Sequence, residues 1–70
     1  MKYVYIIERA GDGSCSAYVP DLPGCTTSGD TPDDVRQSIK DAVATYIESL
    51  REHGEPVPPP TSIVEEVEAA

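Results

Sequence analysis

Apolar and polar residues follow a strand-like order in the first part of the chain and a helical order after it. The run Lys2–Glu8 is rich in Tyr, Val and Ile and ends in a polar turn, so it predicts a β-strand. Side chains alternate between the two faces of a strand, so the odd positions from Tyr3 to Ile7 share one face, and Val4 and Ile6 the other. Because both faces are apolar, we expect cover from a helix on one side and from a further layer, such as a partner chain, on the other.

A tight turn and a returning strand follow this first run. The pair Asp12-Gly13 indicates a hairpin, because glycine adopts a positive φ without strain. Beyond it, Ser14–Val19 places small or apolar residues at its odd positions and Ser or Tyr at its even ones. The two runs therefore predict an antiparallel hairpin.

Prolines and a glycine interrupt the pattern at Pro20–Gly24. Pro20 and Pro23 lack the N–H group that a strand ladder needs, so the second strand is expected to end there. Pro23-Gly24 favours a type II turn, with proline and glycine at its two central positions. The short β-prone run Cys25–Ser28 then predicts a third strand.

Helical spacing begins after Asp30. Thr31 is placed to cap a helix that starts at Pro32, and Asp33 and Asp34 fall in the first turn, where carboxylates favour the helix dipole. From there, apolar residues recur every three or four positions, as on one face of an amphipathic helix. The apolar stripe consists of Val35, Ile39, Ala42, Val43, Tyr46, Ile47 and Leu50.

The helix is predicted to end near Glu52 or His53, with Gly54 as the residue that reverses the chain. The proline-rich run Glu55–Pro60 predicts a stiff connector. A last strand is predicted at Thr61–Val67, where apolar residues surround two glutamates that favour an edge position.

The predicted element order is β-β-β-α-β in one domain, residues 1–70. It belongs to the α+β class, with a small, mainly antiparallel sheet and one helix packed on a face. A composition of 39% hydrophobic and 26% charged residues is typical of globular chains. A domain of this size is only marginally stable alone, so we expect a homo-oligomer, either a dimer or a tetramer.

The formal net charge of −8 narrows the choice of partner. It argues against direct nucleic-acid binding and against anionic membranes, because both depend on Lys and Arg. It favours a basic protein partner. No apolar run approaches the ~20 residues of a membrane helix, and the first residues do not form a signal peptide, so a cytoplasmic location is expected.

No set of residues predicts a catalytic, cofactor or metal site. The single histidine, His53, falls at the predicted helix end, where a capping role is expected. Cys15 and Cys25 fit no zinc motif and are interpreted as two small, partly buried hydrophobic residues. Asp12 and Asp21 fall at opposite ends of the second strand, so they cannot share a metal ion. An enzyme is therefore not predicted, and a metal- or thiol-dependent activity is a minor alternative.

The stretch from Tyr18 to Asp34, YVPDLPGCTTSGDTPDD, resembles the HicB-like antitoxin family. The shared pattern is an aromatic residue in a strand, a short turn ending in Pro23-Gly24-Cys25, and then Thr, Ser and Gly residues before an acidic helix start. The tyrosines of the first strand and the stripe around Ser38–Ala42 also fit, so the resemblance covers roughly residues 2–67.

This resemblance implies a partial RNase H-like fold without the nuclease carboxylates. It also implies an antitoxin that neutralises a small, basic, mRNA-cleaving toxin of the HicA type by covering its active site. Many members continue into a C-terminal DNA-binding domain, and these 70 residues contain none, so the short form is expected, without operator binding. The alternative is a stand-alone HicB-like homo-oligomeric structural or regulatory module with no toxin partner.

Two acidic sites are the candidates for contact with a basic partner. Asp21 and Leu22 are predicted to be exposed in the proline loop. Asp30, Asp33 and Asp34 form the acidic start of the helix. Turn formation and helix capping are the alternative roles of the same residues.

Overall fold

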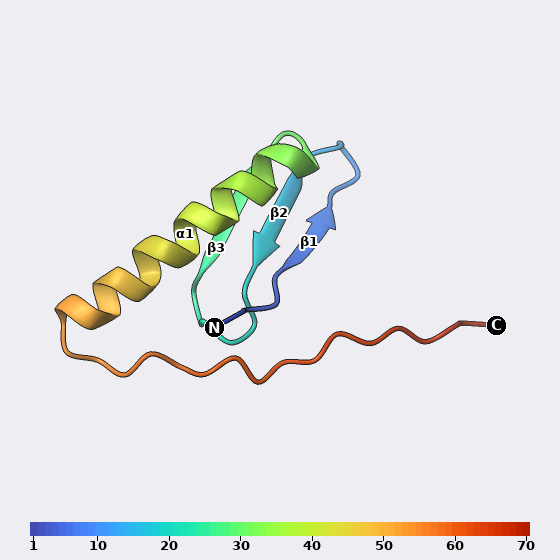
Figure 1. Cartoon of the computed structure of the whole chain (residues 1–70). Helices are drawn as coiled ribbons and strands as arrows, with labels where there is room; N and C mark the ends of the chain where they lie inside the picture. Colours follow the sequence, from blue (N-terminus) through green and yellow to red (C-terminus); the bar gives the residue numbers. More distant parts are fainter.

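Three short antiparallel strands and one long helix form the ordered body of the protein, and the computed structural model describes the whole chain, residues 1–70 (Figure 1). The sheet has the order β1-β2-β3, with β1 at Ile6–Arg9, β2 at Cys15–Tyr18 and β3 at Thr26–Gly29. The helix α1, Pro32–Glu52, lies on one face of the sheet, mainly over β3 and β2. The predicted α+β class, with an antiparallel sheet and a helix on one face, is confirmed.

The first hairpin forms where its turn residues predict it. Gly13 has a φ of 92°, and the Ala10 amide donates to the Ser14 carbonyl at 2.9 Å. The Asp12 carboxylate accepts hydrogen bonds from the Ser14 hydroxyl at 2.7 Å and the Ser14 amide at 2.9 Å. These two bonds, the hydroxyl first, hold the pKa of Asp12 below its usual value, because they stabilise the ionised form.

The core lies between β2 and α1. The odd positions of β2 and the residue after it, Val19, point inward, while Ser16 is exposed on the opposite face, as the alternation predicts. The fully buried residues come from β2, the β2–β3 loop and the first half of α1. They are Cys15, Ala17, Val19, Leu22, Cys25, Val35 and Ile39.

The ends of α1 are also those that the sequence predicts. The Thr31 side chain accepts a hydrogen bond from the Asp34 amide at 3.2 Å, and Pro32 is the first helical residue. At the other end the cap is His53, and Gly54 reverses the chain with a φ of 66°. The helix lacks the long uncharged stretch that crossing a bilayer would require.

The last predicted strand does not form. After α1 the chain runs back beneath the helix, and residues 63–70 extend past β1 and away from the body (Figure 1). Ile63 and Val67 are 82% and 93% exposed. The pattern of this segment is that of a strand, but a strand exists only when a neighbour accepts its backbone hydrogen bonds, and no segment of this chain does so.

Candidate functional site

The β2–β3 loop, Val19–Cys25, is a closed and well-anchored turn. The Val19 amide donates to the Cys25 carbonyl at 3.1 Å, and the Cys25 amide donates to the Leu22 carbonyl at 3.0 Å. Gly24 has a φ of 81°, as a type II turn requires at this position. The Tyr46 hydroxyl donates to the Pro23 carbonyl at 2.8 Å, which ties the loop to α1.

Leu22 is not on the surface, so its predicted exposure is wrong. Its side chain has no exposed area and packs in the core with Val35 and Ile39. The Leu22 amide donates to the Val19 carbonyl at 3.1 Å, so the chain turns at Pro20-Asp21 and Leu22 comes back toward the core. Leu22 therefore stabilises the fold, and it presents no surface that a partner can reach.

Asp21 is occupied by contacts within the chain. Its carboxylate accepts the amides of Thr61 and Ser62, each at 3.0 Å, and their hydroxyls at 3.1 and 2.9 Å. The Ser62 amide and the other three donors lower the pKa of Asp21, because each of them stabilises the ionised carboxylate. We call this set of contacts the Asp21 clamp. Nothing in the local sequence indicates it, since the partners are about 40 residues apart.

The acidic helix start is the part of the predicted contact surface that is exposed. Asp30, Asp33 and Asp34 all lie on the surface around the first turn of α1. Asp33 pairs with Arg36 one turn later, yet its side chain remains 91% exposed. Gly29, just before them, packs closely against the helix start. A Cβ added at Gly29 would lie 3.2 Å from the side chains of Asp34 and Val35. The structure thus brings three carboxylates together and leaves them accessible to a basic surface.

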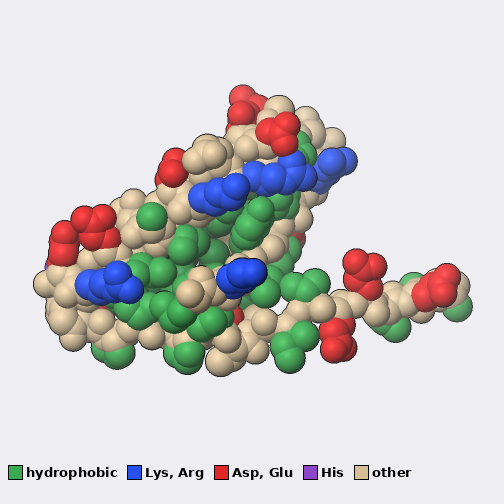
Figure 2. All heavy atoms as spheres, in the orientation of Figure 1, with side chains coloured by type: hydrophobic (Ala, Val, Ile, Leu, Met, Phe, Trp, Pro, Cys, Tyr) green, Lys and Arg blue, Asp and Glu red, His purple; other side chains and the backbone are tan.

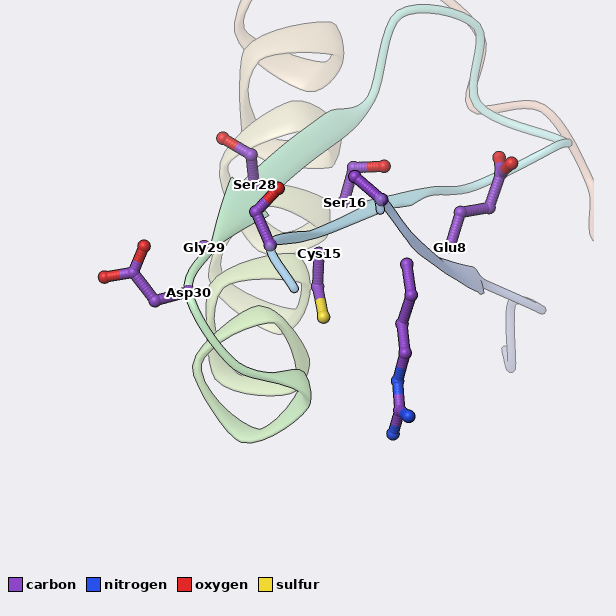
Figure 3. Close-up of a pocket in the computed structure, with 9 residues that line it drawn as sticks. Glu8, Cys15, Ser16, Ser28, Gly29 and Asp30 are labelled. Carbon is purple, nitrogen blue, oxygen red and sulfur yellow. The ribbon is translucent and has the colours of Figure 1, made fainter. Parts of the chain in front are cut away.

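A shallow polar depression of about 490 Å³ lies beside this acidic end, on the hairpin end of the sheet (Figure 3). Glu8, Ser16 and Ser28 are paired across the three strands and point from the sheet face that α1 does not cover. The Cys15 thiol points the other way, toward the helix. The depression offers hydroxyls and carboxylates to a partner.

The remaining chemistry-bearing side chains are dispersed or buried. Cys15 and Cys25 are free thiols in the core, and burial raises the pKa of Cys25, which keeps it protonated. His53 makes a contact of 2.7 Å with the Ser49 carbonyl at the end of α1. No three His, Cys, Asp or Glu side chains come together in the geometry of a metal site.

A second surface, with the opposite charge, was not anticipated. Arg36, Lys40, Val43, Ile47 and Arg51 follow one another at spacings of three or four residues, so they form one row along α1. Figure 2 shows Lys and Arg side chains gathered around a band of apolar side chains between α1 and the N-terminal segment. The helical spacing of the three basic residues was the signal that could have revealed this surface.

Comparison with known proteins gives consistent relatives. Residues 3–70 match the family described as HicB_like antitoxin of bacterial toxin-antitoxin system. A UPF0150 protein of Thermoplasma acidophilum is 47% identical over 58 residues, which cover 83% of this chain and 84% of that protein. A UPF0150 protein of Synechocystis is 40% identical over 63 residues, 90% and 80% of the two chains. A chain in the solved structure titled "HicA3 and HicB3 toxin-antitoxin complex" is 33% identical with a TM-score of 0.70, covering 86% of this chain and 70% of that one.

Proposed function

Because this chain belongs to the HicB-like antitoxin family of bacterial toxin–antitoxin systems, we propose that it is an antitoxin that binds and neutralises a HicA-type toxin. The observation that carries the proposal is the similarity, over 86% of the chain, to a protein solved in a HicA3 and HicB3 toxin-antitoxin complex. The family description supports a regulatory role, in which the protein acts by binding. The buried thiols and the dispersed carboxylates are consistent with inhibition by binding.

The proposed contact surface is the acidic helix start. Asp30, Asp33 and Asp34 are exposed, adjacent and opposite in sign to a basic toxin. Exposed carboxylates at an interface act mainly on the association rate, because they steer a basic partner toward the surface. Asp21 and Leu22 contribute only indirectly, since the first is held in the clamp and the second in the core.

Co-expression with a HicA-type toxin, such as the product of a small basic reading frame adjacent to its gene, tests the proposal. The antitoxin is expected to restore growth and to copurify with the toxin. Failure of both with a toxic neighbour that is expressed and folded would overturn the proposal.

Charge reversal tests the surface separately. The triple change of Asp30, Asp33 and Asp34 to Lys is expected to slow association with the toxin by about tenfold or more at low salt. The matched control makes the same change at three exposed acidic residues elsewhere on α1, namely Asp41, Glu48 and Glu52. Equal loss in both variants would show that only net charge matters, and circular dichroism would confirm that each variant folds.

A further inference from the structure

The C-terminal segment combines large exposed apolar side chains with glutamates, although a solvated tail does not need apolar side chains. Residues 63–70 read IVEEVEAA, and Ile63, Val64 and Val67 are among the most exposed large apolar side chains of the protein. Along an extended chain, one face carries Ile63, Glu65 and Val67, and the other carries Val64, Glu66 and Glu68. Such a segment has the pattern of a strand that covers an apolar surface edged by positive charge.

A surface with that chemistry lies on the protein itself. We define the apolar strip as Tyr3, Ile7, Val43 and Ile47, four half-buried side chains on the β1 side of α1. The connector touches the strip only where the Tyr3 hydroxyl donates to the Pro58 carbonyl. The rest lies open because α1 lies over β3 and β2, and nothing pairs with the outer edge of β1 (Figure 1). The backbone groups on that edge are free to accept a further strand.

Cations border this strip although the chain as a whole is strongly acidic. Lys40 and Arg51 flank Val43 and Ile47 on α1, and Arg9 follows Ile7 on the same face of β1. The one salt bridge in the structure joins Arg36 to Asp33, so these three cations have no acidic partner within the chain. Figure 2 shows the basic side chains around the apolar band. The tail carries the opposite charge in Glu65, Glu66 and Glu68.

The tail does not reach the strip of its own chain. The Asp21 clamp holds Thr61 and Ser62, and the chain then runs beyond the ends of the strands and out past β1 (Figure 1). To lie along its own β1 it would have to turn sharply at Ile63-Val64. These two β-branched residues favour extended backbone and supply no turn chemistry.

We propose that the C-terminal segment of one copy adds as a fourth strand to the β1 edge of a second copy, where Ile63 and Val67 cover the apolar strip and Glu65, on the same face, lies among the cations Arg9, Lys40 and Arg51. The exchange is reciprocal, because in a two-fold dimer each copy both gives a tail and receives one. It also supplies the hydrogen-bonding neighbour that Ile63–Val67 lacks in a single chain. This dimer does not depend on the proposed toxin.

Light scattering of the full chain tests the assembly. The wild type is expected at twice the 7.5 kDa of a single chain. The variant Ile63→Asp with Val67→Asp is expected to be monomeric, and its fold should survive because neither side chain contacts the core. A wild-type monomer at high micromolar concentration, or a dimer unaffected by these changes, would overturn the proposal.

Complementary charge reversal tests the pairing. Lys40→Glu with Arg51→Glu, and separately Glu65→Lys, should each weaken the dimer by roughly tenfold or more. An equimolar mixture should recover association, because each reversed tail then meets a reversed strip in the other variant. Asp41→Lys with Glu48→Lys is the control for net charge, and it should leave the dimer intact.

Nuclear Overhauser contacts between a labelled and an unlabelled copy decide which chain supplies the tail. Contacts from Ile63 and Val67 to β1 are expected only between copies. Contacts found only within one copy would overturn the exchange, even if the tail forms a strand.

Discussion

Asp21 and Ser62 lie 41 residues apart in the chain and are joined by two hydrogen bonds, at 3.0 Å from the Ser62 amide and 2.9 Å from its hydroxyl. Thr61 adds two more bonds to the same carboxylate. A second contact, from the Tyr3 hydroxyl to the Pro58 carbonyl, fixes the connector a few residues earlier. The end of the chain is therefore directed by the loop after β2, and not by packing against the core.

Replacing Asp21 by Ala should release the tail while leaving the sheet and helix folded. The substitution removes the acceptor of all four hydrogen bonds. Amide exchange at Thr61 and Ser62 is expected to accelerate, with little change at β2 and α1. Asp21→Asn should give an intermediate rate, because its amide keeps one acceptor oxygen. Unchanged exchange in the Ala variant would contradict the clamp.

The clamp should also open in acid. Its hydrogen bonds lower the pKa of Asp21 from the usual 3.8, so the folded group binds its proton less readily than the unfolded one. The stabilisation is therefore complete only well above the unfolded pKa of 3.8, and it is lost as the pH falls from that value through the lowered pKa. The chemical shifts of the Thr61 and Ser62 amides should follow this titration. In Asp21→Asn, which cannot titrate, the same shifts should stay flat.

Leu22→Ala should destabilise the protein strongly, although the sequence predicted Leu22 to be exposed in a loop. The side chain has no exposed area, so its removal leaves a cavity and costs about 2–5 kcal/mol of unfolding free energy. Urea unfolding measures the loss. Glu48→Ala, at an exposed helix position, is the control and should stay within about 0.5 kcal/mol of the wild type.

The first hairpin turn offers a matched pair of glycines. Gly13 and Gly11 both have open space where a Cβ would be added, but only Gly13 has a positive φ, 92°. Gly13→Ala should therefore cost about 1–2 kcal/mol, since an L-residue is strained in that conformation. Gly11→Ala should change the free energy of unfolding by no more than about 0.5 kcal/mol. Equal effects would show that backbone strain is not the cause.

The features that the sequence predicted correctly are those set by neighbouring residues. The Thr31 cap, the Pro23-Gly24 turn and the alternation of β2 each depend on a few consecutive positions, and all three are present. Leu22 was misplaced because burial in a loop depends on what packs above it. The strand at Thr61–Val67 was misplaced because its hydrogen-bonding neighbour is not specified locally.

The residues of the candidate site also separate into those fixed by neighbouring positions and those fixed by distant contacts. Asp30, Asp33 and Asp34 were found as an exposed acidic group because the helix start fixes them. The role of Asp21 could not be found, since it requires knowing where the chain returns after the prolines.

The two buried cysteines can report how often the core of this protein opens. Cys15 and Cys25 are each 3% exposed, and the raised pKa of Cys25 disfavours the thiolate that alkylating reagents attack. Modification then requires that β2 and its loop separate from α1. The alkylation rate under native conditions therefore measures how often the core opens, so a stabilising partner can be detected by slower labelling, without a tag or an added probe.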